Sequence, residues 1–409
     1  MKKEIDIHNY PRLLKRAEKN LEKSDISDRN KELILEFRDY CSLEGEIGLP
    51  RTIRYLGVLR DWALLLNKDY DVACTEDIKK AVRVVQENEK YSEWTKITYK
   101  TMLKRFYKWL KKTEDSPEEV KWISTRMKRT DKKILSSSEL ITEEEVKKMV
   151  NAAEHPRDKA FISILYESGA RVSEVASLQI KNVQFDEHGA ILTVQGKTGS
   201  RHIRIISSVS YLSIWAQSHP LKEDPNAPLW INIGTTKHNS QITYNNIRYI
   251  VKKLADKAGI EKKTNPHMFR HSRATYLANH LTEFQMNQYF GWVQGSGMPA
   301  TYVHLSGKNL DNSLLSLNGV KQENETQESS ISPRICPRCE TINSHDAKFC
   351  IKCGGILDVK TAMELEKKSE VEKNERSNAD NIMDVLMKDK EFQKLFAKKV
   401  KELGVKVGG

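Results

Sequence analysis

A tyrosine near residue 300 follows two arginines, a lysine and a histidine in an order that suits phosphoryl transfer without a metal. The segments are Gly169-Ala170-Arg171, Gly196-Lys197-Thr198-Gly199, His267-Met268-Phe269-Arg270, Gly291-Trp292 and Thr301-Tyr302. When a tyrosine oxygen attacks a phosphodiester, negative charge concentrates on the non-bridging oxygens, and fixed cations must stabilise it. Guanidinium groups remain charged and can hold two phosphate oxygens at once. We therefore predict that Arg171 and Arg270 clamp the phosphate.

Such a reaction also needs two proton transfers. The attacking phenol has an ordinary pKa of about 10 and must lose a proton, while the leaving 5′ oxygen must gain one. We assign Lys197 as the general acid and His267 as the base that assists Tyr302.

This ordered series resembles the catalytic domain of the tyrosine recombinase, or phage integrase, family over roughly residues 140 to 310. The resemblance implies a site-specific recombinase or integrase that forms a 3′-phosphotyrosyl link at Tyr302 and exchanges strands through a Holliday junction, with no ATP and no catalytic metal. Most members carry a histidine where this chain has Trp292, whose indole N–H can donate a hydrogen bond but cannot shuttle a proton. Glu174 falls where the family often has an acidic residue, and we expect it to orient the neighbouring cations.

Two other functions use some of the same features. A type IB topoisomerase shares the chemistry but rejoins the same duplex, and the small helical N-terminal region argues against it. A non-catalytic zinc-ribbon DNA-binding regulator is disfavoured because all five charged, imidazole and phenol side chains are present together. Each residue alone is more often surface charge or core packing. His271, next to the second arginine, is interpreted in that ordinary way.

Composition agrees with a protein that acts on DNA. The 409 residues include 68 Lys plus Arg against 56 Asp plus Glu, which gives a net charge of +12. Such an excess is typical of nucleic-acid binding. No apolar run approaches the roughly 18 to 20 residues of a membrane helix, and no signal peptide is visible. We expect a cytoplasmic, nucleoid-associated protein that binds specific sites in double-stranded DNA. The resemblance adds self-association to a tetramer on DNA, with an accessory protein as a further candidate partner.

The chain divides into several predicted parts. We expect a mainly α fold with a small β-hairpin (α+β), in which a helical core-binding (SAM-like) domain over 1–125 and a catalytic domain over 139–317 are joined by a basic linker over 126–138. The resemblance implies that the two domains close on DNA as a C-shaped clamp. Thr142 and Glu145 form a capping box that opens the catalytic domain, and the runs 190–194 and 202–206 predict a hairpin.

Basic residues on the predicted helices and the linker are the candidate DNA contacts. In 99–112, lysines lie opposite an apolar stripe, and that face is either simply solvated or in contact with phosphates. We favour phosphate contact. The predicted DNA-binding residues are Arg51, Arg54, Lys100, Lys104, Lys108, Lys111, Arg126, Lys128 and Arg129.

The C-terminal part contains a second motif. After a predicted disordered tether over 318–333, the pattern C-x2-C-x10-C-x2-C predicts a zinc ribbon over 334–357 that holds a structural Zn²⁺ through Cys336, Cys339, Cys350 and Cys353. Disulfides are the less favoured alternative in a cytoplasmic protein. Residues 358–409 are expected to form a charged linker and an amphipathic helix that docks another subunit. Contact with DNA, contact with protein and simple capping of the chain remain equally open as roles for the ribbon.

Overall fold

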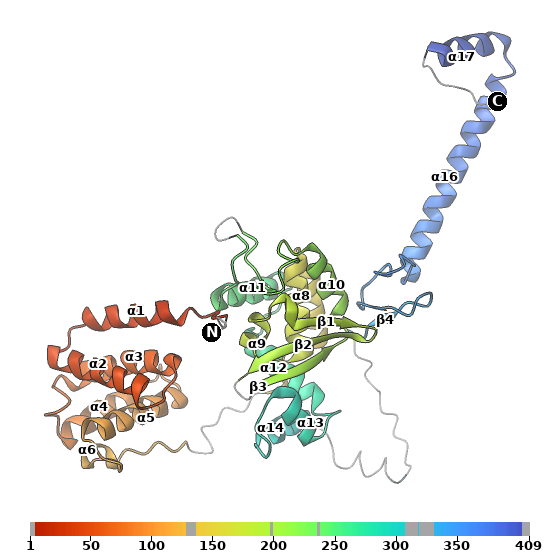
Figure 1. Ribbon diagram of the computed structural model, residues 1–409. Coiled ribbons are helices and arrows are strands. Elements are labelled where there is room, and N and C mark those ends of the chain that lie inside the picture. The colour runs from red at the N-terminus through yellow and green to blue at the C-terminus, as the bar shows by residue number, and fades with distance from the viewer. Residues whose placement is uncertain are drawn as a thin grey trace.

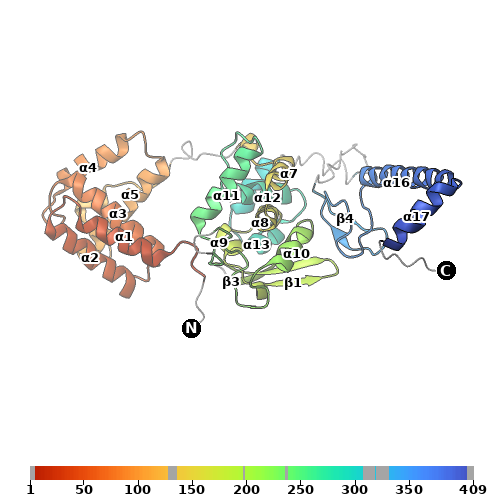
Figure 2. The same ribbon diagram turned by 90° about the horizontal axis from the view of Figure 1, so that it is seen from above.

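The computed structural model describes residues 5–127, 136–196, 199–234, 238–306, 318 and 331–402. Most of them are helical, and the strands form one three-stranded and one two-stranded antiparallel sheet. A helical unit, a central unit with the larger sheet, and a C-terminal part with a long helix follow one another in a row (Figures 1 and 2). The predicted α+β class is confirmed. Among the described residues, no helix combines the length and apolar character needed to cross a membrane.

The N-terminal unit is a bundle built around α3. Its helices are α1 (Tyr10–Glu22), α2 (Asp28–Leu43), α3 (Leu49–Leu66), α4 (Thr75–Glu87), α5 (Glu93–Leu110) and α6 (Glu118–Lys121). Trp62 of α3 is fully buried, and its indole nitrogen donates a hydrogen bond to the carbonyl oxygen of Tyr99, 3.1 Å away. A buried indole needs such an acceptor, so this bond fixes α5 against α3.

The first described residues pack on the central unit instead of on this bundle. Ile7 is 3% exposed and belongs to the apolar core of the central unit. Its carbonyl oxygen accepts a hydrogen bond of 2.9 Å from the backbone nitrogen of Tyr244, and the His8 ring lies 4.8 Å from the Tyr244 ring. The chain therefore touches the central unit before α1 begins, and the start of the helical domain at residue 1 stays a prediction.

The central unit surrounds one buried helix. Its elements are η2 (Ser137–Glu139), α7 (Glu143–Ala152), α8 (Pro156–Ser168), α9 (Val172–Ala176), η3 (Ile180–Asn182), β1 (Val183–Asp186), β2 (Gly189–Gly196), β3 (Gly199–Ile205), α10 (Val209–Ser218), α11 (Tyr244–Lys257), α12 (Pro266–Leu277), α13 (Glu283–Phe290) and α14 (Met298–Ser306). Every residue of α8 from Ala160 to Ser168 is buried, as expected for a helix that is covered on all sides.

Two local predictions for this unit are confirmed. The hydroxyl oxygen of Thr142 accepts from the backbone nitrogen of Glu145 at 3.2 Å, and the Glu145 carboxylate accepts from the backbone nitrogen of Thr142 at 2.8 Å. The predicted hairpin consists of β2 and β3, paired from Ala190 with Ile205 to Gly196 with Gly199.

The end of α8 sets the direction of the chain into the next helix. Gly169 closes α8 in the left-handed region, at a φ of +53°. A Cβ atom at Gly169 would lie 2.8 Å from Cε1 of Phe290, so both the backbone angle and the space require glycine there. This turn delivers Arg171 to the start of α9.

The first residues of the C-terminal part pack on α10 and on the core of the central unit. Its elements are β4 (Arg334–Ile335), β5 (Ile342–Asn343), α16 (Val359–Leu386) and α17 (Lys390–Glu402). The Tyr211 hydroxyl of α10 donates to a carboxylate oxygen of Asp346 at 2.6 Å. Ile331 joins the central core, and Ile342 packs against it. Residues 331–333, predicted as the end of a disordered tether, thus begin a packed module.

The predicted C-terminal amphipathic helix is divided in two. The chain leaves the helical conformation after Leu386, and the Asp389 side chain accepts backbone hydrogen bonds from Glu391 and Phe392 at the start of α17. Leu395 on α17 is 68% exposed in this structure. Docking of this helix on another subunit remains a prediction.

Candidate active site

Arg171 and Glu174 form the first part of the site at the start of α9. Arg171 is the N-cap residue of this helix. Its Nη1 donates to Glu174 Oε1 at 2.9 Å, and its backbone nitrogen donates to Glu174 Oε2 at 2.8 Å. The Arg171 side chain keeps 31% of its surface exposed, whereas that of Glu174 keeps 2%. The guanidinium is thus oriented by a buried carboxylate and remains accessible to a ligand.

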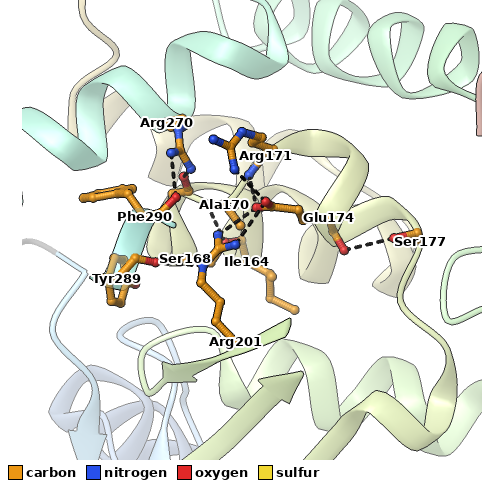
Figure 3. Close-up of polar contacts among 11 residues, drawn as sticks. Ile164, Ser168, Ala170, Arg171, Glu174, Ser177, Arg201, Arg270, Tyr289 and Phe290 are labelled. Carbon is orange, nitrogen blue, oxygen red and sulfur yellow. Dashed lines mark hydrogen bonds and ion pairs between the residues drawn. The ribbon is translucent and has the colours of Figure 1, made fainter. Parts of the chain in front are cut away.

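A second arginine, Arg201 of β3, binds the same carboxylate. Its Nη1 donates to Glu174 Oε1 at 3.0 Å and its Nη2 donates to Oε2 at 2.7 Å (Figure 3). Burial alone would raise the pKa of Glu174, but the hydrogen bonds and charge of Arg201, joined by those of Arg171, hold the pKa below its ordinary value. Glu174 is therefore ionised at neutral pH. The sequence reasoning missed Arg201.

Arg270 reaches the site from α12. Its Nη1 donates to the carbonyl oxygen of Gly169 at 3.0 Å and its Nη2 donates to that of Phe290 at 2.8 Å. The guanidinium carbon lies 5.0 Å from the centre of the Phe290 ring and 5.4 Å from that of Trp292. Burial, followed by the charge of Arg171, lowers the pKa of Arg270 to about 10, so it remains a cation at neutral pH. Figure 3 shows the two predicted clamp arginines side by side.

Tyr302 lies in a small apolar cluster beside these arginines. It is 3% exposed and packs with residues of α12 and α13, including Phe290. The Trp292 ring stacks on it with 5.4 Å between ring centres and 4° between planes. Burial raises the pKa of Tyr302, and the charge of Arg270 offsets part of that effect. The predicted nucleophile is therefore a protonated phenol here, and Trp292 supports its ring.

His271 contacts this phenol, although the sequence analysis gave His271 only an ordinary packing or surface role. Its Nδ1 lies 2.8 Å from the Tyr302 hydroxyl oxygen. Burial, with the charges of His267 and Arg270, lowers the pKa of His271 to about 4. A neutral imidazole that carries its proton on Nε2 can accept the phenolic proton at Nδ1. The spacing of four residues from His267 could have indicated a shared helix face.

His267, the predicted base, lies next to His271 on α12. The two rings have centres 4.4 Å apart. Burial, followed by the charges of Arg270 and Arg171, lowers the pKa of His267. Both imidazoles are therefore neutral at neutral pH, and the one in contact with the hydroxyl is His271.

Lys197, the predicted general acid, lies outside the described residues. The preceding residue, Gly196, is the last residue of β2 and packs against Glu174 and Arg201. A Cβ atom at Gly196 would lie 2.5 Å from Glu174 Oε1 and 3.2 Å from Arg201 Nη1. Only glycine lets the strand approach the carboxylate this closely. The hairpin end that leads to Lys197 is thus part of the site.

The predicted DNA-binding lysines of α5 bind acceptors within the bundle. The Lys100 ammonium donates to Gln86 Oε1 at 3.0 Å, and the Lys104 ammonium donates to the carbonyl oxygen of Ile123 at 3.1 Å. The Lys108 ammonium donates to the carbonyl oxygen of Glu114 at 2.7 Å. Lys111, just after α5, forms an ion pair with Glu119 Oε1 at 3.0 Å. These contacts give the lysine face a role in packing within the bundle, and its contact with phosphate stays a prediction. Arg51, Arg54 and Arg126 are exposed, and Lys128 and Arg129 lie outside the described residues.

The four predicted zinc ligands come together. The sulfur atoms of Cys336, Cys339, Cys350 and Cys353 all lie within 4.8 Å of one another. The Sγ atoms are 3.6 Å apart between Cys336 and Cys353, and 3.5 Å apart between Cys339 and Cys350. Tetrahedral Zn–S bonds of about 2.3 Å require sulfur separations of roughly 3.8 Å. The donors and their spacing therefore fit a four-thiolate zinc site, and the cysteines are not in disulfides.

Comparison with known proteins decides the family. Residues 139–309 match the phage integrase family, and this range contains both clamp arginines, both imidazoles and Tyr302. Residues 139–309 are thus a domain of the phage integrase family. The match ends before the four cysteines.

Two proteins similar to this chain carry the name tyrosine recombinase. XerA of Pyrococcus horikoshii is 30% identical over 148 residues, which cover 36% of this chain and 50% of XerA. XerD of Ralstonia nicotianae is 25% identical over 293 residues, which cover 68% of this chain and 91% of XerD. A solved structure of the XerH site-specific recombinase bound to a palindromic difH substrate is similar in fold, with a TM-score of 0.53 at 18% identity over 78% of this chain and 98% of XerH. The chain spans only half the length of the XerA relative that it matches.

Proposed function

We propose that this recombinase breaks and rejoins double-stranded DNA at specific sites through Tyr302. The observation that carries the proposal is the placement of a phenol with an imidazole on its hydroxyl beside two converging arginines, Arg171 and Arg270. Phosphate binding needs the arginines, and nucleophilic attack needs the phenol and its proton acceptor.

The chemistry is a balanced exchange of ester bonds. The Tyr302 oxygen attacks the scissile phosphorus, a tyrosyl phosphoester forms, and the bond from phosphorus to the 5′ oxygen breaks. The phenolic proton passes to an imidazole, for which His271 has the direct contact, and Lys197 gives a proton to the leaving 5′ oxygen. Arg171 and Arg270 stabilise the charge on the non-bridging oxygens. Because the reaction conserves the phosphoester, the free 5′ hydroxyl of a partner strand can reverse it without ATP.

The described structure corresponds to a resting state of the site. Tyr302 is 3% exposed, and a phosphate in a duplex cannot reach a hydroxyl that is covered in this way. We infer that α14 shifts when DNA binds, so that the Tyr302 hydroxyl meets a phosphate held by the arginines. Residues 298 to 302 form the first part of this short helix, which packs on α12 and α13.

A basic groove beside the site is the better candidate for contact with DNA phosphates. It has a volume of about 840 Å³ and runs along α11 to Pro266 at the start of α12. Arg248, Lys252 and Lys263 line it and are exposed. Guanidinium and ammonium groups on a continuous surface attract the phosphate backbone without reading its sequence. Assembly as a tetramer on two duplexes, with a Holliday-junction intermediate, belongs to this proposal, as does an accessory protein.

We also propose a structural Zn²⁺ on the four cysteines. A four-thiolate site leaves no open coordination position, so the ion would supply folding energy to the ribbon and take no part in the DNA chemistry. Asn343 and the backbone of Lys352 direct N–H groups at the Cys350 sulfur, 3.7 Å and 3.4 Å away. Such bonds stabilise a thiolate.

A recombination assay tests the proposed function. A duplex site is first selected by binding from a random library, and two copies are placed in one plasmid. Wild-type protein should yield recombinant circles in magnesium-free buffer, and the Tyr302→Phe variant, which retains the ring, should yield none. Relaxation of a plasmid without sites, and no recombinants, would support the topoisomerase alternative. Tight binding with neither product would support the regulator alternative.

A further inference from the structure

Arg201 of β3 contacts both α9 and the end of α13, but it has no part in the chemistry described so far. All three of its described bonds are directed inward: Nη1 and Nη2 donate to Glu174, and Nε donates to the carbonyl oxygen of Tyr289 at 2.9 Å (Figure 3). Its side chain is 12% exposed. The guanidinium is thus held among protein acceptors, away from the position that a phosphate clamp requires.

Arg201 is connected to Arg171, the clamp arginine of α9, through Glu174. Glu174 divides its carboxylate between Arg201 and Arg171, and its Oε1 accepts from both. A buried carboxylate with a single cationic partner would lose much of the stabilisation of its charged form. Arg201 therefore keeps Glu174 ionised, and ionised Glu174 fixes the Arg171 guanidinium.

Arg201 is also connected to Arg270, the clamp arginine of α12, through the end of α13. Arg201 holds the carbonyl oxygen of Tyr289, and Arg270 holds that of Phe290, the next residue. The two carbonyls lie at the end of α13, which closes at Gly291. A shift of this helix end relative to β3 would therefore move an anchor of Arg270.

A third set of contacts joins Arg201 to β2, the strand that precedes Lys197 in the sequence. Arg201 lies on β3 opposite Val194 of β2. The Gly196 backbone packs against the pair that Arg201 makes with Glu174. The end of β2, the strand that precedes Lys197 in the sequence, is thus held against the arginines by the same ion pair.

We propose that Arg201 is a positioning residue that sets the relative placement of Arg171, Arg270 and the end of β2 at Gly196. This inference rests on the proposed function. A planar guanidinium with three donor nitrogens can bind a carboxylate in a bidentate manner and a third acceptor at the same time, whereas a lysine ammonium has no such fork. The Arg201→Lys variant should therefore keep the positive charge but lose the simultaneous bonds to Glu174 and to the Tyr289 carbonyl oxygen.

The test compares three variants with the wild-type protein in cleavage of a nicked suicide duplex at pH values from 5.5 to 8. Arg201→Met removes the charge and the bonds, Arg201→Lys removes the geometry, and Arg204→Met is the matched control. Arg204 lies on the same strand but pairs with Asp186 at an exposed position. Thermal melting and DNA affinity are measured in parallel.

We expect Arg201→Met and Arg201→Lys to bind DNA with affinity near that of the wild type and to form adduct about 100-fold more slowly, because misplacement of the catalytic groups by about 1 Å has an effect of this size. Arg204→Met should cleave at the wild-type rate. In Arg201→Met the rate relative to wild type should fall further as the pH is lowered, because the pKa of Glu174 rises when Arg201 no longer holds it down. Adding Glu174→Gln should abolish this extra pH dependence.

The outcomes separate the two proposals. Wild-type protein that forms no adduct would contradict the proposed function, whatever the variants do. If the wild-type protein cleaves and Arg201→Met or Arg201→Lys cleaves at the same rate, the positioning role of Arg201 is overturned and the proposed function stands. If Arg201→Met does not fold, Arg201→Lys decides. A rate ratio for Arg201→Met that stays constant with pH and does not respond to Glu174→Gln would show a merely structural ion pair.

Discussion

The Nδ1 atom of His271 lies 2.8 Å from the hydroxyl oxygen of Tyr302, while the Trp292 ring stacks on the Tyr302 ring with 4° between their planes. The Tyr302 side chain is therefore contacted at its hydroxyl oxygen by His271 and on the face of its ring by Trp292. Burial keeps the phenol protonated, and the low pKa of His271 keeps the imidazole neutral. This pairing gives the phenolic proton a defined acceptor before DNA arrives.

The His271→Gln variant should form the covalent adduct at least about 100-fold more slowly, which is the lower range for loss of a general base. Glutamine can still bond to the Tyr302 hydroxyl but cannot take its proton at neutral pH. The rate of adduct formation on a nicked duplex is the measurement. His267→Gln is the matched control on the same helix face, and we expect a smaller loss from it. Faster cleavage by His271→Gln would identify His271 as a restraint on Tyr302 instead of a base.

Stability should depend on pH through the same histidine. Its folded pKa of about 4 lies below the ordinary value of 6.5, so the unfolded chain binds the proton first as the pH falls. The contribution of His271 to the free energy of unfolding is thus complete above about pH 6.5 and is lost as the pH falls towards 4. The melting temperature of His271→Gln should fall less steeply than that of wild type between pH 6.5 and 5. Parallel curves would contradict the low pKa.

The zinc ribbon should depend on its metal, while the catalytic domain should not. Cys336→Ser removes one of the four thiolates, so we expect loss of bound zinc and faster proteolysis of residues 331–402, with the central unit still folded. Zinc content by atomic absorption and limited proteolysis measure the two effects. Cys74→Ser, at an exposed cysteine of the helical bundle, is the control. Equal zinc content and equal proteolysis in both variants would contradict a metal site at the four cysteines.

Docking of the ribbon can be tested without removing the metal. Tyr211→Phe keeps the ring but deletes the hydroxyl that donates to Asp346 at 2.6 Å. We expect full zinc content together with easier proteolytic release of the ribbon, because a hydrogen bond to a charged group stabilises by about 1.5 to 3 kcal/mol. Unchanged release would show that Ile331 and Ile342 alone hold the ribbon on the central core.

The salt dependence of DNA binding should identify the phosphate-binding surface. Arg248→Ala and Lys252→Ala should each lower the slope of log affinity against log salt by about 1, as expected for loss of one phosphate contact. Lys104→Ala on α5 should leave the slope unchanged, because its ammonium is bound to the Ile123 carbonyl oxygen. The opposite result would restore the lysine face of α5 as the DNA contact.

Local signals in the sequence predicted the features that depend on neighbouring residues. The capping box at Thr142, the hairpin of β2 and β3, and the four-cysteine cluster all follow from spacing within a few residues, and the structure confirms each of them. The order of the motifs also indicated that Arg171, Arg270 and Tyr302 would meet.

Features that depend on long-range partners were not predictable in this way. Arg201 and His271 gain their roles from residues 27 and 31 positions away, Glu174 and Tyr302. No local pattern distinguishes Arg201 from an ordinary strand side chain, and the spacing of His271 from His267 indicates a shared helix face but no contact with Tyr302. The lysines of α5 fit a basic face equally well whether they bind phosphate or the bundle itself. Docking of Ile7 on the central core likewise depends on Tyr244, far along the chain.

Mapping of the covalent adduct shows directly whether Tyr302 is the nucleophile. The protein is incubated in magnesium-free buffer with a nicked duplex of its selected site, the SDS-resistant product is digested, and the peptide that carries the nucleotide is identified by mass spectrometry. We expect a phosphotyrosyl bond at Tyr302 in the wild-type protein and no adduct from Tyr302→Phe, which should bind the same duplex equally well. An adduct on any other residue, or an adduct formed by Tyr302→Phe, would contradict this expectation.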